Sequence, residues 1–188
     1  MKQINLATPH FIIMVGIPGS GKSFFAEHFS TTFNAPLISF EQISHIVAKS
    51  DTTAGMAELF LVQLLKTRQT IVYEGETSSR VDRQDLAKRA RDNDYIPLFV
   101  WVQTESVAAK QRSTKQAKIN RLTSDQFDAA LRKFTPPNAS EKAIVVSGKH
   151  TYASQLKIVL SRIASERQHV TEQRPEIQRP AGRSIMIR

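Results

Sequence analysis

A glycine-rich segment at residues 16–23 constrains the fold of this chain more than any other feature. It reads Gly-Ile-Pro-Gly-Ser-Gly-Lys-Ser and directly follows the apolar run Phe-Ile-Ile-Met-Val at 11–15. The apolar run predicts a strand buried on both faces, as in a parallel sheet, and residues 22–32 carry apolar side chains with the period of a helix. A strand, a glycine-rich turn and a helix in this order indicate an α/β domain with the turn at the end of its first strand.

The residue types in this segment suit the binding of a triphosphate. Glycines permit positive φ and leave the backbone N–H groups accessible, and the N-terminus of the following helix carries unpaired amides. In this pattern, Lys22 is expected to bridge the β- and γ-phosphates of ATP, and the Ser23 hydroxyl to complete the shell of Mg²⁺. The predicted nucleotide contacts are Gly16, Ile17, Pro18, Gly19, Ser20, Gly21, Lys22, Ser23 and Phe24. The alternative is a turn that binds nothing, which has no use for Gly-Lys-Ser at this spacing.

Apolar runs and helical periods alternate along the rest of the chain. Further strands are predicted at 37–40, 70–73, 96–102 and 143–146, and helices at 22–32, 41–48, 53–66, 80–92, 104–116, 124–134 and 152–164. Ser50-Asp51-Thr52 and Thr104 are expected to cap two of these helices. The alternation predicts a three-layer α/β/α domain over residues 1–167, with a five-stranded parallel sheet. Residues 168–188 are polar, carry Pro and Arg and have no period, which predicts a flexible basic tail.

Composition excludes some classes of protein and leaves one partner open. The chain of 188 residues has no cysteine, so disulfide frameworks and thiolate metal sites are excluded. The apolar run near the N-terminus is too short for a signal peptide or a membrane span, so we expect a cytoplasmic protein. The net charge is +9, and residues 167–188 carry five Arg against two Glu. Because a basic chain attracts polyanions, a nucleic-acid partner stays open through this tail and through the basic stretch at 110–121.

Two acidic residues follow predicted strands. Glu74 ends the third strand, and because the carboxyl ends of parallel strands line the ligand crevice, its carboxylate is expected to hold Mg²⁺ through water. Glu76 is close enough to take that role instead, and a solvated or helix-capping Glu74 is the alternative. Glu41 follows the second strand and is expected to accept a proton from an attacking hydroxyl as general base. An acid in the first turn of a helix, favoured by the helix dipole, explains Glu41 almost equally well.

The stretch 110–121 holds basic residues and no acid, namely Lys110, Arg112, Lys115, Lys118 and Arg121. Like charges three and four residues apart repel on a helix, so a solvated face would normally mix the two signs. A helical lid over about 104–122 that brings cations to the γ-phosphate accounts for the bias. Arg112 is the first candidate and Lys115 the second. A merely basic surface helix is the alternative.

The chain resembles the predicted-kinase branch of the P-loop proteins, which includes bacterial and phage polynucleotide 5′-kinases. The resemblance spans about residues 10–165. Besides the glycine-rich loop, it lies in the third strand with its turn, Ile-Val-Tyr-Glu-Gly-Glu-Thr-Ser-Ser-Arg-Val-Asp-Arg at 71–83, and in Phe-Thr-Pro-Pro at 134–137 followed by Glu141. It implies the strand order 2-3-1-4-5 and ATP with Mg²⁺ as the donor. By position, Glu41 matches the acid that activates the acceptor, Glu74 the strand-three acid, and Arg112 a lid arginine.

The sequence departs from this family at several positions. Glu41 and Glu74 are one methylene longer than the family's Asp, and Ser44 stands where polynucleotide kinases have an Arg that binds the acceptor's phosphate. GTPases are disfavoured because residues 114–117, Thr-Lys-Gln-Ala, lack the Asp that reads guanine. The sequence therefore predicts an ATP-dependent kinase that transfers the γ-phosphoryl group to a hydroxyl of a nucleic-acid 5′ end, a nucleotide or another small molecule. The alternatives are an ATP-binding module or weak ATPase that binds nucleic acid, and a degenerate kinase.

Overall fold

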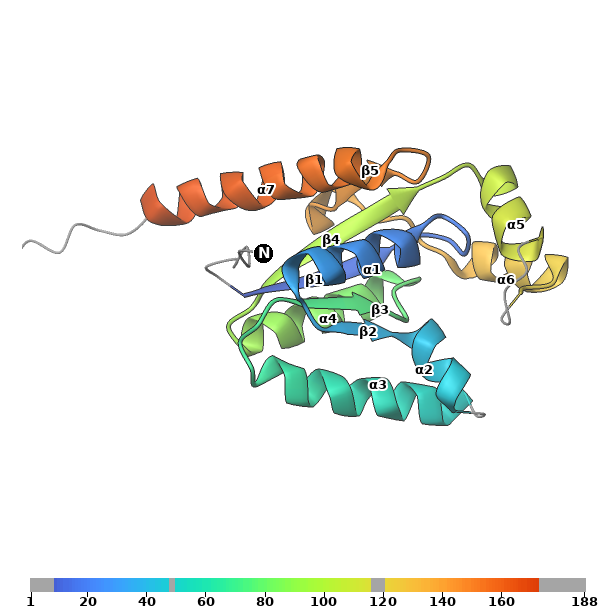
Figure 1. The fold of residues 1–188 in the computed structure, drawn as a ribbon, viewed down its shortest axis with the longest axis horizontal. Helices are drawn as coiled ribbons and strands as arrows, with labels where there is room; N and C mark the ends of the chain where they lie inside the picture. Colours follow the sequence, from blue (N-terminus) through green and yellow to red (C-terminus); the bar gives the residue numbers. More distant parts are fainter. Residues whose placement is uncertain (1–8, 48–49, 116–120, 173–188) are drawn as a thin grey trace, which may run out of the picture.

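The computed structural model describes residues 9–47, 50–115 and 121–172, which form one parallel sheet between two layers of helices (Figure 1). The sheet has five strands in the order β2-β3-β1-β4-β5, and all neighbouring strands are parallel. The fold class and the strand order predicted from the sequence are therefore confirmed. The strands are β1 (His10–Val15), β2 (Leu37–Ser39), β3 (Ile71–Glu74), β4 (Ile96–Gln103) and β5 (Ile144–Ser147).

The central strand, β1, is buried along its whole length because helices cover both faces of the sheet. Helices α1 (Lys22–Phe33) and α7 (Tyr152–Glu172) cover one face, and α3 (Ser50–Leu65) and α4 (Arg80–Asp92) the other (Figure 1). Successive strand residues point to opposite faces. Ile12 and Met14 accordingly belong to the core beneath α1 and α7, and Phe11 and Ile13 to the core beneath α3 and α4. The apolar run thus has the double burial that the sequence predicts.

The remaining helices lie near the carboxyl ends of the strands. They are α2 (Phe40–Ile46), α5 (Ser106–Lys115) and α6 (Ser124–Lys133), and a short 3₁₀ turn, η1 (Ala139–Glu141), leads into β5. Within the described ranges, no helix has both the length and the apolar character needed to cross a membrane.

Most helix ends differ from the sequence prediction by a residue or more, and three of these differences concern the predicted caps and the predicted tail. α3 begins at Ser50, so the predicted cap at 50–52 is wrong, because these residues already belong to the helix. α5 begins two residues after Thr104, whose hydroxyl donates to the Ser20 carbonyl oxygen at 2.9 Å. The predicted cap at Thr104 is wrong because this long-range bond engages the side chain. α7 continues to Glu172, past the predicted start of the tail. The rest of the predicted tail, 173–188, and lid residues 116–120 with Lys118 lie outside the described residues.

Helices α5 and α6 form a small unit of their own beside the glycine-rich loop. α6 begins with a capping box, in which Thr123 accepts from the Gln126 amide and the Gln126 side chain accepts from the Thr123 amide. Ala109 of α5 and Phe127 of α6 are buried against Ile17 of the loop. The core of this helix pair therefore includes the loop itself. The lid predicted at about 104–122 stays a prediction, and we call α5 and α6 the lid helices, or the lid, for their position beside the loop.

Candidate active site

The segment at 16–23 forms a loop between β1 and α1 whose shape requires glycine. Gly16, Gly19 and Gly21 have φ angles of 148°, 74° and 107°. At Gly19, a Cβ atom would lie 2.2 Å from the carbonyl oxygen of Ala109, so the backbone of α5 lies directly against the loop. Gly21 is the N-cap of α1 and supplies no side-chain cap, which leaves the first amides of the helix available to an anion.

Lys22 lies along the inside of this loop. Its ammonium group donates a hydrogen bond to the Ile17 carbonyl oxygen at 3.0 Å. Burial lowers the pKa of Lys22, and the carboxylates of Glu74 and Glu41 act in the opposite direction. A buried ammonium group with carboxylates nearby puts positive charge where the sequence pattern predicts the phosphates.

Ser23, in the first turn of α1, contacts the acid at the end of β3. Its hydroxyl donates to Glu74 Oε1 at 2.6 Å, and the other oxygen of Glu74 accepts from Ser39 at 3.3 Å. Ser39 ends β2 and is the register partner of Glu74, so the parallel pairing of these strands brings the two side chains together. Burial raises the pKa of Glu74, while the hydrogen bond from Ser23 and the charge of Lys22 offset part of the rise. Glu74 is therefore a buried, hydrogen-bonded carboxylate, and the alternative that it is a solvated surface residue is wrong.

Glu41 reaches the same hydroxyl from the other side. It lies in the first turn of α2, and its Oε2 is 3.4 Å from Ser23 Oγ. Glu76, by contrast, is exposed at the rim of the site. One hydroxyl and two carboxylates are oxygen donors, the type that Mg²⁺ prefers, and Mg²⁺ commonly takes only one or two carboxylates and completes its shell with phosphates and water. Ser23 and Glu74 thus fit the predicted metal.

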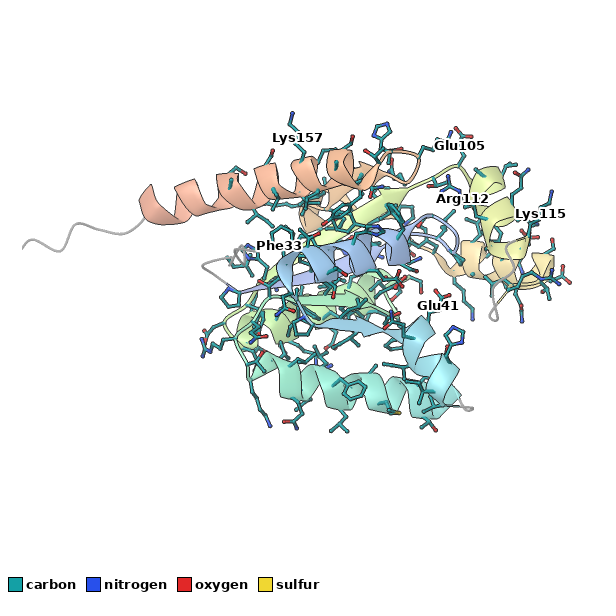
Figure 2. All side chains as sticks on the ribbon, viewed as in Figure 1. Phe33, Glu41, Glu105, Arg112, Lys115 and Lys157 are labelled. Atoms are coloured by element: carbon teal, nitrogen blue, oxygen red, sulfur yellow. The ribbon has the colours of Figure 1, made fainter. Side chains whose placement is uncertain are left out.

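The two lid cations are placed differently (Figure 2). Arg112 lies on the side of α5 that faces the body of the protein, and its Nη1 donates to the Gly148 carbonyl oxygen at 3.1 Å. Lys115 is exposed at the outer end of α5 and does not line the cavity. The basic run is also less unbalanced than the sequence suggests, since Lys110 pairs with Asp128 of α6 at 2.7 Å. The structure therefore brings Arg112 to the site and leaves Lys115 outside it.

A cavity of about 1060 Å³ joins these groups. It is bounded by the phosphate loop, by α2 and the start of α3, by the acids at and after the end of β3, by the lid, and by the segment after β5. The residues of the loop and first turn that line it are Pro18, Gly19, Gly21, Lys22, Ser23 and Phe24, whereas the predicted contacts Gly16, Ile17 and Ser20 are not among its lining residues. This volume is at the upper limit of pockets for drug-sized ligands, which is about 1,000 Å³.

Sequence reasoning missed a buried ion pair that connects α4 and the turn after β3 with the segment after α6. Arg83 of α4 is fully buried and bonds both oxygens of Glu141, at 2.6 and 3.1 Å. The same guanidinium donates to the carbonyl oxygens of Thr77, Ser78 and Thr135. Both charged residues stand in the segments that carry the family resemblance. Their pairing was not visible because the two lie 58 residues apart.

The strand order and the phosphate loop with its buried strand-three acid define a P-loop protein with the small-kinase fold. Residues 11–137 match the AAA domain family (AAA_33). The chain belongs to this family, since the match covers more than half of its length. A search of curated proteins gave no match.

Solved structures share this fold at low sequence identity. A gluconokinase from Sinorhizobium meliloti 1021 is 17% identical with a TM-score of 0.65, covering 89% of this chain and 98% of that chain. Kti12 from Chaetomium thermophilum, in complex with ADP-AlF3, is 12% identical with a TM-score of 0.61, covering 84% and 97%. A chain of the Pnkp1/Rnl/Hen1 RNA repair complex is 20% identical with a TM-score of 0.57, covering 71% of this chain and 46% of that one. The likeness establishes the fold and leaves the acceptor to be argued from the site.

Proposed function

We propose that this chain is an ATP-dependent kinase that transfers the γ-phosphoryl group of ATP to a hydroxyl group. The hydroxyl can belong to any of the acceptors predicted from the sequence, a nucleic-acid 5′ end, a nucleotide or another small molecule. The observation that carries the proposal is the convergence of Glu41 and Glu74 on the hydroxyl of Ser23, next to Lys22. Phosphoryl transfer requires a cation and amides for the triphosphate, oxygen ligands for a metal, and a base, and these residues supply that set.

Each group has a role in the proposed transfer. Lys22 and the loop amides would hold the β- and γ-phosphates. Ser23 and Glu74 would hold Mg²⁺, which would supply positive charge to neutralise the phosphate oxygens. Glu41 accepts the proton of the acceptor hydroxyl while the oxygen of that hydroxyl attacks the γ-phosphorus. The bond from that phosphorus to the β–γ bridging oxygen breaks, and ADP leaves. Arg112 stabilises the charge on the transferred group, whereas Lys115 would reach it only after the lid moved.

A screen of ADP formation with Mg-ATP and pooled hydroxyl acceptors, including 5′-hydroxyl oligonucleotides, tests this function. Lys22→Ala is expected to abolish transfer because it removes the cation of the loop. Lys88→Ala, on the exposed face of α4, is the matched control and should leave transfer unchanged. Full activity in the Lys22→Ala variant would contradict the assignment.

Calorimetric titration with Mg-ATP separates the kinase from a degenerate one. Binding with no ADP formation in any pool would favour a protein that holds ATP without turnover. The second alternative, a nucleic-acid-binding module, depends mainly on the basic tail. Residues 173–188 lie outside the described part of the chain, so we do not propose it.

A further inference from the structure

The strand order divides the cavity into two halves around the phosphate loop. β1 is central, with β3 and β2 on one side and β4 and β5 on the other. The half beside β2 and β3, which we call the acceptor half, contains the proposed base. It is lined by Phe40, Glu41, Ser44, Thr53, Ala54 and Glu76. The opposite half is lined by Arg112 and by the segment after β5, and Lys22 lies between the two.

Charge is distributed unequally between these halves. The described residues that line the cavity include four carboxylates, Glu27, Glu41, Glu74 and Glu76, against the two cations Lys22 and Arg112. Lys22 belongs to the phosphate loop, and Arg112 bonds Gly148 after β5, so the cations are directed to the triphosphate. The acceptor half is therefore acidic even before an anionic triphosphate binds next to it.

Two of the four carboxylates exceed what phosphoryl transfer requires. Glu74 and Glu41 account for the metal and the base, which leaves Glu27 and Glu76. Glu27 accepts from Gln42 of α2 at 3.4 Å, so it lies on the acceptor side. Among the described residues, neither Glu27 nor Glu76 forms an ion pair with a Lys or Arg. Their charges are thus available to a ligand.

The aromatic ring of Phe40 also lines the acceptor half. Phe40 is next to Glu41, and its ring packs edge-on against Tyr73 with centroids 5.8 Å apart. A Cβ atom on Gly75 would lie 2.6 Å from the ring, so the turn that carries Glu76 lies directly against Phe40. Burial and then the nearby charge of Glu76 raise the pKa of Tyr73 to about 12, so the field of that carboxylate extends to this aromatic wall. An aromatic face bordered by carboxylates is a suitable environment for an ammonium group.

We propose that the acceptor is a small hydroxyl compound that carries an ammonium group, such as an amino alcohol or an amino sugar. This inference depends on the proposed kinase function and narrows it. The ammonium group would lie between Phe40 and the carboxylates of Glu27 and Glu76, with the hydroxyl directed to Glu41. A phosphorylated or carboxylated acceptor would place another anion beside four carboxylates and a triphosphate, which like-charge repulsion disfavours.

Three acceptor pools of similar size test the proposal: amine-bearing alcohols and sugars, the corresponding neutral polyols and sugars, and anionic compounds comprising sugar acids, sugar phosphates and 5′-hydroxyl oligonucleotides. With Mg-ATP, we expect transfer to the first pool, with kcat/KM for an amine about tenfold or more above that for its neutral counterpart. The advantage should shrink as ionic strength rises, because salt screens exposed charges. Preferred transfer to the anionic or the neutral pool would overturn the inference and leave the kinase function intact.

Isosteric variants assign the preference to the acceptor half. Glu76→Gln and Glu27→Gln should raise KM for the amine several-fold while leaving KM for the neutral counterpart unchanged, a split that general loss of structure would not give. Glu105→Gln removes an exposed carboxylate that directly precedes α5, pairs with Lys149 and does not line the cavity, and it is the control. An amine preference that survives Glu27→Gln with Glu76→Gln would overturn the assignment.

If no pool is phosphorylated, a binding assay still tests the ligand class separately from the kinase function. In this assay, thermal unfolding is followed in the presence of Mg-ADP and each pool. A rise in the midpoint with amines, reduced by Glu76→Gln, would reject the kinase function and retain the ligand class. No shift with amines would reject the ligand class as well.

Discussion

The buried carboxylate of Glu74 opposes folding in the protein without nucleotide. Its side chain lies beneath Ser23 and Ser39, and burial raises its pKa above the ordinary value of 4.5. The native state therefore binds this proton more tightly than the unfolded chain does. Its contribution to stability decreases as pH rises from about 4.5 through the raised native pKa, and above that pH the penalty is complete.

Replacing Glu74 with Gln should stabilise the protein and inactivate it. The amide has the same shape without the charge, so we expect a higher thermal midpoint once the wild-type carboxylate is ionised, and a flatter midpoint profile above pH 4.5. ADP formation should fall at least ~100-fold because a metal-binding carboxylate is lost. Thermal unfolding across pH and the ADP assay measure the two effects. A midpoint profile identical to that of the wild type would contradict the account of Glu74 as a buried charge.

Two glycines offer a matched comparison of the phosphate loop with an ordinary helix. Gly19→Ala should destabilise the protein by ~1–3 kcal/mol, because φ is positive and the new Cβ would collide with the Ala109 carbonyl. Gly55→Ala, in α3 with nothing within 4 Å of its Cβ position, should stabilise by ~0.5–1 kcal/mol through helix propensity. Urea unfolding of the two variants gives both values. Equal effects would mean that the loop does not need its glycine.

At the scale of elements, Arg83 and Glu141 connect α4, the turn after β3 and the segment that leaves α6. The pair is almost fully buried, with side-chain exposures of 0% and 3%. Burial acts to raise the pKa of Glu141, but the hydrogen bonds from Arg83 and Asn138 outweigh it and lower that pKa. The stabilisation by this ion pair is therefore present above the ordinary pKa of 4.5 and lost as pH falls through the lowered native value.

Arg83→Met should destabilise the protein by ~3–5 kcal/mol, since it leaves the buried Glu141 carboxylate without its partner. The double variant Arg83→Met with Glu141→Met should recover part of that loss, because no uncompensated charge remains. Denaturant unfolding at pH 7 measures both, and Arg91→Met on the exposed end of α4 serves as control. A double variant less stable than the single one would contradict this account, because it would show that the Glu141 carboxylate stabilises the fold without Arg83, through the bond from the Asn138 amide.

How well sequence predicted each element depends on how local its determinants are. The strands and the phosphate loop follow from apolar runs and glycine spacing, which act over a few residues. The sequence predicted that Glu41 and Glu74 lie at the same edge of the sheet as Ser23. It did not predict their hydrogen bonds to Ser23, because the register of β2 on β3 sets these distances. Thr104 was assigned to a cap because its bond partner, Ser20, lies 84 residues away. Likewise, the sequence does not show that Arg112 reaches the site and Lys115 does not, because this depends on how α5 packs on the loop.

For the whole molecule, the length of α7 decides where the basic tail can be removed. The helix continues to Glu172, so a cut at 168, as the sequence suggests, would shorten a helix. A chain ending at Glu172 should keep the thermal shift by Mg-ATP and the turnover of the full chain, since the described site draws nothing from later residues. Nucleic-acid binding measured across salt shows what the tail adds, and a flatter salt slope in the truncated chain would indicate lost phosphate contacts. If the truncated chain lost the thermal shift by Mg-ATP, residues after 172 would be needed for nucleotide binding, which would contradict this prediction.

The placement of Ser39, Glu41 and Glu74 on the β2–β3 side, and of Arg112 and Gly148 on the β4–β5 side, separates two tasks along the sheet. Under the proposed function, substitutions in α2 and at the start of α3 that leave Glu41 and Glu74 in place can alter which compound is modified without disturbing how ATP is held. Relatives that share the loop at 16–23 can therefore differ in the compound they modify through changes on one side of the sheet, while the other side stays the same. An exchange of residues 40–60 between two such relatives should transfer the choice of compound and leave the preference for ATP where it was.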